Sequence, residues 1–235
     1  MRSSEQIENI KKNISEPFVI KDFLNTEDIL HLINLFSKTE VNPVKVYKNT
    51  GPITVDIRQF ANDLVIEKIF EKLFDHIGNY ELTAGFFFTT NYPHIIHNDD
   101  LHDLPNNVYK GITIPLKING NAIPKLCFFN QFYFHGPSKF FNGDNDIPTF
   151  YNKQVYNYEL VENLTKDHKI DNLTISKYFT HLKPSWLDGL SLWGCLDWIP
   201  GDAIIFDSVR LHCASDFRAQ GIKDKLGISI FTKKI

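Results

Sequence analysis

The hydrophobic pattern of the chain changes at Gly78, and this change constrains the fold more than any other feature. Before Gly78, apolar residues recur at the spacing of amphipathic helices. After it, short apolar or alternating runs are separated by Pro, Gly, Asn and Asp, which is typical of strands joined by turns. Eight runs fit this description: 81–90, 93–99, 110–118, 125–134, 196–200, 203–208, 212–217 and 225–232. We therefore expect a mainly β protein.

The N-terminal part predicts helices that support this sheet structure. Residues 1–15 are polar and predict a short or frayed helix. Residues 16–24 read as a short strand that leads into a turn. A helix should follow with Asn25 or Thr26 as its N-cap, since such side chains accept hydrogen bonds from free helix N–H groups. A second helix is expected over residues 55–77, where apolar residues form one continuous stripe.

Eight short strands behind two helices suit a double-sheet jelly roll, also called a double-stranded β-helix, with the helices packed on one sheet. The 235 residues suit a single domain over 1–235. In it, residues 1–80 are the mostly helical support and 81–235 the jelly-roll core. Residues 135–194 form a long polar insertion with little periodicity, which predicts a lid or a binding loop. The alternative is a passive surface insertion.

Composition narrows the possible partners. A formal net charge of −3 argues against electrostatic binding to nucleic acid or to an anionic membrane. No apolar run has the length of a membrane span, and residues 1–13 lack the apolar centre of a signal peptide. We expect a cytoplasmic protein, whose cysteines Cys127, Cys195 and Cys213 are reduced core thiols.

Two histidines and an aspartate form the most informative constellation. His97 and Asp99 lie two residues apart, so in an extended segment both side chains point to the same side. His212 opens the seventh predicted strand and would reach the same interior from across the sheets. Two imidazoles and one carboxylate leave coordination positions open and suit non-heme Fe(II) with oxygen and a bidentate co-substrate. The alternative is a surface histidine beside an acid, because such pairs also arise by chance.

The last predicted strand places a cation on the same inward face. Lys225, Gly227 and Ser229 alternate with apolar residues, so all three share one side of the strand. A buried cation is costly unless it is paired, and a dicarboxylate co-substrate would supply the partner. Ser229 could add a hydrogen bond, and Gly227 leaves room beside Lys225. The alternative is that Lys225 extends to solvent at the strand end.

Other candidates are open to two readings. Gln131 and Tyr133 share a face of one strand and could touch the co-substrate or substrate, or simply pack in the core. His94 should face away from His97, as a supporting or surface residue. Asp207 could orient a metal ligand by a hydrogen bond or could serve a turn. Four aromatic residues are expected in the core rather than in a pocket: Phe86, Phe88, Trp193 and Trp198.

Four segments together resemble the Fe(II)- and 2-oxoglutarate-dependent dioxygenases, of the phytanoyl-CoA hydroxylase and prolyl hydroxylase type. EPFVIKDFLNTEDILHLI at 16–33 resembles their opening strand and helix. HND at 97–99, WIPGDAIIFDSVRLH at 198–212 and KLGISIF at 225–231 resemble the His-x-Asp motif, the distal histidine with its preceding turn, and the last strand. The resemblance covers most of the chain apart from the insertion, and it is specific at the level of the superfamily.

The resemblance implies a function and roles for the matching residues. His97, Asp99 and His212 would bind iron, and Lys225 would hold the distal carboxylate of 2-oxoglutarate. Many members carry arginine in place of this lysine, so Arg218 and Lys223 are fallback candidates. The expected activity is an O2-dependent hydroxylation of a small molecule or a peptide side chain, with release of succinate and CO2. Related halogenases lack the carboxylate ligand, so Asp99 favours hydroxylation or another oxidation.

Two rival functions use the same fold. A cupin-like metal enzyme without 2-oxoglutarate needs the metal ligands but no buried cation opposite them. A jelly-roll binding module for carbohydrate or protein would use the aromatic residues as stacking platforms and leave His97, Asp99 and His212 without a role. The sequence indicates neither the substrate nor the oligomeric state.

Overall fold

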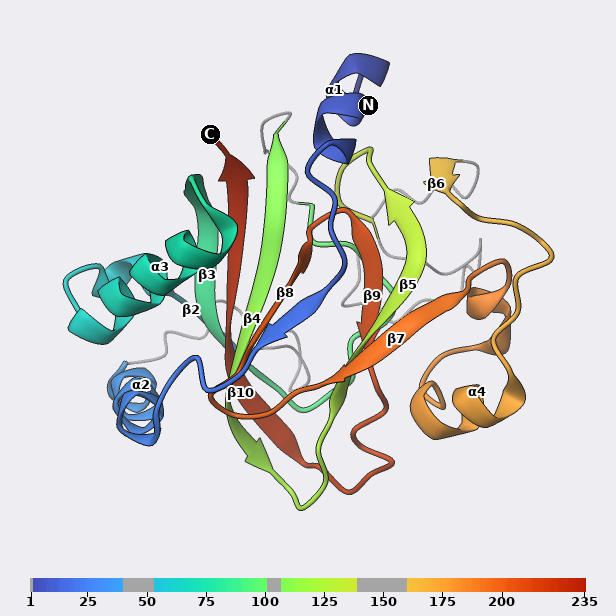
Figure 1. Ribbon diagram of the computed structural model, residues 1–235. Coiled ribbons are helices and arrows are strands. Elements are labelled where there is room, and N and C mark those ends of the chain that lie inside the picture. Colours follow the sequence, from blue (N-terminus) through green and yellow to red (C-terminus); the bar gives the residue numbers. More distant parts are fainter. Residues whose placement is uncertain (1, 40–52, 101–106, 139–159) are drawn as a thin grey trace.

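Two antiparallel sheets face each other in the computed structural model, which describes residues 2–39, 53–100, 107–138 and 160–235 (Figure 1). The larger sheet consists, in spatial order, of β1 (Phe18–Ile20), β8 (Ala203–Asp207), β4 (Val108–Asn119), β10 (Asp224–Lys234), β3 (Tyr80–Thr90) and β2 (Ile53–Asp56). The smaller sheet is built on β5 (Lys125–Tyr133), which pairs with β6 (Val161–Glu162), β7 (Leu192–Asp197) and β9 (Arg210–Ala214). The expectation of a mainly β protein is confirmed.

Strand β10 lies in the middle of the larger sheet and shows how the sequence alternation becomes two faces. Ser229 lies opposite Phe86 on β3 and opposite Thr113 on β4. Because neighbouring strand residues point to opposite sides, Ile228 and Ile230 enter the outer core while Ser229 lines a cavity between the sheets. The inward face expected for this strand is therefore present.

The outer face of the larger sheet is covered by α2 (Thr26–Lys38) and α3 (Leu64–Ile77), at the left of Figure 1. Helix α2 begins with a capping box, in which Asn25 and Asp28 each accept a backbone N–H of the other. On α3, the completely buried Ile69 and Leu73 pack against the strands. Helices therefore pack on one sheet, as expected. In the described parts of the chain, no helix is long and apolar enough to span a membrane.

The helix expected over residues 55–77 is wrong in its first half. The chain forms β2, a 3-10 helix (Ile57–Phe60) and only then α3. Two aspartates mark the boundaries between these segments. Asp56 caps the 3-10 helix by accepting the N–H of Arg58, and Asp63 caps α3 by accepting those of Val65 and Ile66. The β-branched segment before Asp56 pairs with β3 at the edge of the sheet instead of continuing the helix.

The strand expected at 93–99 is reduced to a single bridge residue. His97 pairs with His212 through two backbone hydrogen bonds of 2.9 Å, and the residues around His97 have no regular strand partner. Pro93 lacks an N–H for a ladder, which limits pairing at the start of this run. The His-x-Asp motif thus lies on an extended loop that runs antiparallel alongside β9.

The described part of the insertion covers the outer face of the smaller sheet. It contains β6, α4 (Asn172–Tyr178) and a 3-10 helix (Pro184–Leu187) before it reaches β7. Phe179, Trp186 and Leu190 are buried there against β5 and β9. No residue from 160 to 191 lines the cavity between the sheets. The described part of the insertion therefore does not line the cavity, and residues 139–159 of the expected lid or binding loop lie outside the described part.

The N-terminal helix α1 (Ser4–Lys11) closes one end of the two sheets, at the top of Figure 1. Its Ile10 packs with Val108 at the start of β4, with Phe134 after β5 and with Val209 between β8 and β9. The first residues of the chain are thus attached to both sheets rather than frayed.

Two of the three cysteines are not the free thiols that the sequence predicted. Cys127 on β5 lies directly opposite Cys195 on β7, and the two form a disulfide. Cys213, opposite Cys127 on the other neighbouring strand, is a buried free thiol. The reason is strand register, which brings residues 68 apart in sequence side by side.

Candidate metal centre

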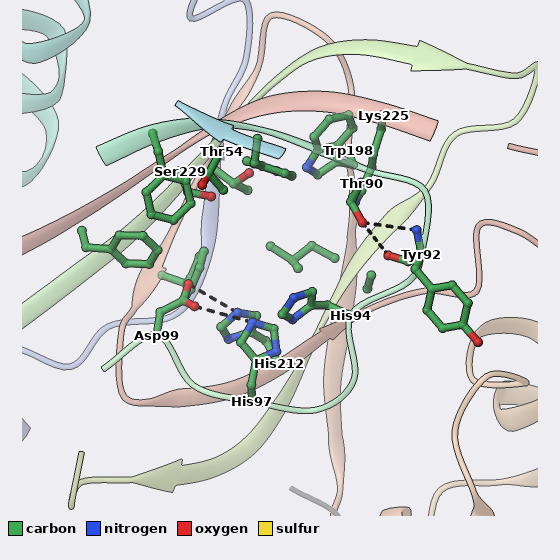
Figure 2. A pocket seen from close by; sticks show the side chains of 17 residues that line it. Thr54, Thr90, Tyr92, His94, His97, Asp99, Trp198, His212, Lys225 and Ser229 are labelled. Carbon is green, nitrogen blue, oxygen red and sulfur yellow. Dashed lines mark hydrogen bonds and ion pairs between the residues drawn. The ribbon is translucent and has the colours of Figure 1, made fainter. Parts of the chain in front are cut away.

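A cavity of about 250 Å³ lies between the two sheets, and the predicted constellation opens into it (Figure 2). The larger sheet contributes side chains of β2, β3, β4, β8 and β10, and the smaller sheet those of β5 and β9. Figure 2 shows His97, Asp99 and His212 together at one wall, with Lys225 and Trp198 across the cavity.

The structure brings the three predicted ligands together. His97 Nε2 lies 3.5 Å from Asp99 Oδ1, and His212 Nε2 lies 3.5 Å from Asp99 Oδ2. One donor atom from each residue lies within 4.8 Å of the other two. Backbone contacts fix this arrangement, because Asp99 donates its N–H to Ser208 O at 2.8 Å and the two histidines form the bridge between their segments.

The residue between the ligands anchors their loop. Asn98 is 5% exposed and points away from the cavity. Its amide nitrogen donates to the carbonyls of Tyr133 and Gly136 at 3.0 Å, and its oxygen accepts the N–H of Ser138 at 2.7 Å. A buried amide with three partners is well satisfied and fixes the backbone on either side. The sequence analysis did not single out Asn98, although its place between His97 and Asp99 in the sequence was a signal for such a role.

Both imidazoles are held in the tautomer that a metal requires. His97 Nδ1 lies 2.7 Å from Ile95 O, and His212 Nδ1 lies 3.0 Å from Arg210 O. A carbonyl oxygen only accepts hydrogen bonds, so each Nδ1 carries a proton and each Nε2 is the ring nitrogen that can bind a metal. This is the usual way in which outer partners orient metal-binding histidines.

The charges of the site also suit a cation. Burial, with help from His212 and His94, holds the pKa of His97 well below its ordinary value, so this imidazole is neutral. Burial by itself raises the pKa of Asp99, but His212 and His97 outweigh that effect and the pKa lies below its ordinary value. Two imidazoles and one carboxylate on one side of a shared point fit Fe(II), with positions open toward the cavity.

Lys225 is the buried cation of this cavity. Its side chain lies over the rings of Trp198 at 4.5 Å and Phe217 at 5.1 Å, and no carboxylate pairs with it among the described residues. Burial lowers the pKa of Lys225 to about 7. A Cβ at Gly227 would lie 2.8 Å from the Trp198 ring. Glycine at this position therefore allows Trp198 to pack beside Lys225.

Of the other residues expected to bind the co-substrate, only Ser229 lines the cavity. Gln131 and Tyr133 do not reach it. Gln131 donates to Asn163 O at 2.9 Å and accepts the N–H of Ser191 at 3.0 Å, and Tyr133 is buried in the outer core. The pleat of β5 explains this, because Leu126 lines the cavity and residues an odd number of positions away face outward.

Three further candidates are placed elsewhere. Asp207 forms a buried ion pair with Lys110 at 2.5 Å and does not contact the metal-ligand histidines. The fallback cation Arg218 is exposed and donates to Asn91 O at 2.9 Å. Lys223 is exposed as well. Among the basic residues weighed for the co-substrate, Lys225 alone lines the cavity.

Several cavity residues were misjudged or missed. The His94 ring lies 4.6 Å from the His97 ring and lines the cavity, because the loop does not alternate as a strand would. Phe86, Phe88 and Trp198 also line it instead of being core alone, whereas Trp193 packs on Phe128 between the sheets. Among the lining residues that sequence reasoning missed are Thr54, Thr113 and Phe206. Inward alternation on their strands was the available signal for the last two.

No protein-family model matches the sequence, and no curated protein matches it. Solved structures share the fold. The non-heme alpha-ketoglutarate-dependent epimerase SnoN from nogalamycin biosynthesis is 11% identical, with a TM-score of 0.53 over 99% of this chain and 84% of its own. The carbocyclase SnoK from the same biosynthesis is 9% identical, with a TM-score of 0.50 over 99% of this chain and 84% of its own. A further SnoN structure contains Fe3+, alpha-ketoglutarate and nogalamycin RO.

Proposed function

We propose that this protein is an Fe(II)- and 2-oxoglutarate-dependent oxygenase with a double-stranded β-helix core. The observation that carries the proposal is the convergence of His97, Asp99 and His212 on a cavity whose opposite side holds the buried Lys225. Two imidazoles and a carboxylate with open positions suit Fe(II). A buried ammonium without a carboxylate partner suits an anionic co-substrate. The fold shared with SnoN supports the same function.

Each residue has a defined task in this proposal. His97, Asp99 and His212 hold the metal, which together with 2-oxoglutarate and O2 supplies the oxidising chemistry, with release of succinate and CO2. Lys225 binds the distal carboxylate of the co-substrate, and Trp198 keeps the ammonium in place from one side. The apolar walls exclude water, which strengthens the attraction between Lys225 and a carboxylate.

Lys225 also separates this proposal from the cupin-like alternative. A metal enzyme without a dicarboxylate co-substrate has no use for a cation buried in the cavity wall. Keeping an unpaired ammonium there costs free energy, as its pKa of about 7 indicates. The position of Lys225 therefore favours 2-oxoglutarate over a metal enzyme that lacks it.

The substrate would be a small molecule or a peptide side chain, and we propose hydroxylation as the reaction. Thr54 and Ser229 lie on the side of the cavity away from Lys225 (Figure 2), and Phe86 and Phe231 line it too, with ring centroids 5.6 Å apart. These four side chains are uncharged, so they suit an apolar or neutral part of the substrate. Asp99 as the third ligand favours an oxidation over halogen transfer.

The proposal is tested by an anaerobic titration of the metal-free protein with Fe(II) and then 2-oxoglutarate, followed in the visible spectrum. A metal-to-ligand charge-transfer band that is absent in His97→Ala is the expected result. Release of succinate under O2 would then be used to screen for substrates. Iron binding without the band would contradict the 2-oxoglutarate assignment, and no iron binding would leave a non-catalytic binding module.

A further inference from the structure

We propose that residues 2–16, here called the N-terminal brace, position the three metal ligands from outside the cavity. The brace comprises α1 and the segment that follows it. Its hydrogen bonds and ion pairs include contacts with residues close in sequence to the ligands, namely Asp100, Asp207 and Arg210. None of the contacts described below is with a ligand itself. The inference rests on the proposed metal site and adds Arg2, Ser15 and Glu16 to it as positioning residues.

The first contact of the brace is with the residue that follows Asp99. The Arg2 guanidinium forms an ion pair with the completely buried Asp100 through both carboxylate oxygens, one of them 2.9 Å from Nη2. It also donates to Phe134 O at 2.6 Å. The Arg2 side chain is only 8% exposed, so this pair is held in geometry and shielded from solvent.

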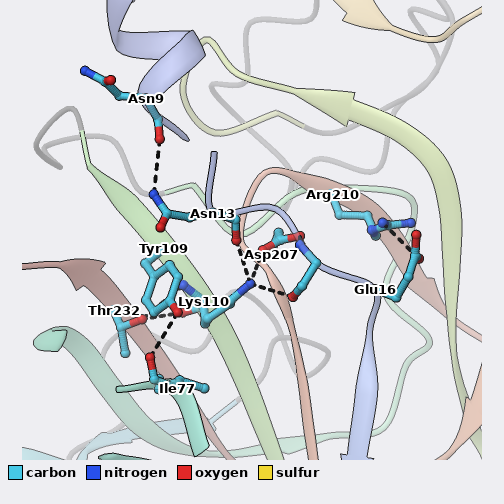
Figure 3. A network of polar contacts seen from close by, with 10 residues as sticks. Asn9, Asn13, Glu16, Ile77, Tyr109, Lys110, Asp207, Arg210 and Thr232 are labelled. Atoms are coloured by element: carbon cyan, nitrogen blue, oxygen red, sulfur yellow. Dashed lines mark hydrogen bonds and ion pairs between the residues drawn. The ribbon is translucent and has the colours of Figure 1, made fainter. Parts of the chain in front are cut away.

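The second contact is a buried network at the turn between β8 and β9 (Figure 3). Lys110 Nζ donates to Ser15 Oγ at 2.8 Å, to Asn13 O at 3.0 Å and to Asp207 Oδ1 at 2.5 Å. The backbone N–H of Ser15 donates to the other oxygen of Asp207 at 3.0 Å. The brace thereby holds Asp207 at the end of β8.

The third contact reaches the segment that carries His212. Arg210 pairs with Glu16 at 3.2 Å, donates to Phe129 O at 3.2 Å and lies 4.5 Å over the Phe132 ring. The carbonyl of the same Arg210 accepts the Nδ1 proton of His212. The residue that fixes the tautomer of a ligand is therefore itself fixed by the brace.

The second and third contacts converge on the turn formed by residues 207–210. That turn supplies two carbonyls to the ligands, Ser208 O for the N–H of Asp99 and Arg210 O for the ring of His212. Metal affinity depends on donors being held before the metal arrives, and outer partners that orient ligands contribute about 10- to 100-fold. Without the contacts of the brace, the turn and the loop at Asp100 would lose their support. The metal would then have to order the ligand atoms of His97, Asp99 and His212 when it binds.

The test compares Arg2→Met with a matched change elsewhere in the brace. Lys11→Met removes an ion pair to Glu162 (2.7 Å) that does not lead to the metal site. We expect Arg2→Met to weaken Fe(II) affinity by about tenfold and to shift the charge-transfer band of the 2-oxoglutarate complex. Arg2→Lys, which keeps the charge but not the two-point geometry, should lie between Arg2→Met and wild type. Lys11→Met should bind iron as wild type does.

Three outcomes separate the inference from the proposed function. Unchanged iron affinity and band position in a folded Arg2→Met would overturn the brace while the proposed function stands. Failure of the wild-type protein to bind Fe(II) would overturn the function and the brace with it. If Arg2→Met does not fold, Glu16→Gln decides, since Glu16 is 68% exposed. Weaker iron binding there supports the brace, and unchanged binding overturns it.

Discussion

Lys225 shows how much a single residue contributes to the candidate site. Because its pKa of about 7 is lowered by burial, about half of the molecules carry the charge near neutral pH. We expect Lys225→Met to weaken 2-oxoglutarate binding by roughly 10- to 100-fold, the worth of a hydrogen bond to a charged group. The charge-transfer titration measures this. Equal affinity in the variant would place the distal carboxylate elsewhere in the cavity.

The same residue predicts a pH dependence with a definite sign. A dianion binds the protonated lysine, so affinity should be flat below pH 7 and should fall as pH rises above it, because binding must then take up a proton. The decline should approach about tenfold per pH unit. Lys225→Arg provides the control, because arginine stays charged and should not decline over this range. A pH-independent wild-type affinity would contradict the assignment.

Gly111 affects the metal ligands through its missing side chain. A Cβ there would lie 2.8 Å from the Phe206 ring and 3.3 Å from Asp99 Oδ2. We expect Gly111→Ala to displace Phe206 and Asp99 and to weaken Fe(II) affinity by about tenfold. Gly194→Ala is the matched control, since no atom lies within 4 Å of a Cβ at that position. Similar iron affinities in both variants would argue against close packing around Asp99.

At the scale of elements, α3 supports the larger sheet without forming part of the cavity. Leu73 of this helix is completely buried, whereas Leu64 is 80% exposed. Leu73→Ala should lower the free energy of unfolding by about 2–5 kcal/mol, because it removes buried methyl groups and leaves a cavity. Leu64→Ala should change it by less than about 0.5 kcal/mol. Thermal unfolding measures both, and equal effects would contradict this packing of α3.

The elements that sequence patterns predicted well are those whose signal is local. Helix α2 has its capping box and apolar stripe within 14 residues, and the side chains of β10 alternate between the outer core and the cavity face from Lys225 to Phe231. The expected helix over 55–77 failed because apolar residues of β2 and of the 3-10 helix happened to continue the stripe of α3. Caps at Asp56 and Asp63 divide these segments, and short polar residues at such positions are ambiguous in sequence.

At the scale of the whole molecule, metal binding should stabilise the fold, because the ligands come from segments that meet only in the folded state. Fe(II) at about 100 times its dissociation constant should add about 2.7 kcal/mol. For a chain of this size that raises Tm by about 5–11 °C. Anaerobic thermal unfolding with and without Fe(II) measures the shift. A similar shift in His212→Ala would show that iron binds elsewhere.

The sequence alone determined the parts of this protein that depend on neighbours along the chain. The alternation of β10 placed Lys225 and Ser229 on one face, and the spacing of His97 and Asp99 placed both side chains together. These follow from backbone geometry, in which residues two apart in an extended segment point the same way. His212 was chosen as their partner because it opens the seventh predicted strand, and the resemblance of its surrounding segment supported that choice.

Only the tertiary structure decided which residues from distant segments meet. Strand register paired Cys127 with Cys195, and the pleat of β5 turned Gln131 away from the cavity. The pairing of Arg2 with Asp100 has no signal in sequence, because the two residues lie 98 positions apart. Such contacts depend on how two sheets and a terminal helix pack together. A periodic pattern in one segment carries no information about its distant partner, and this is why the sequence predicted the ligands but not the residues that hold them.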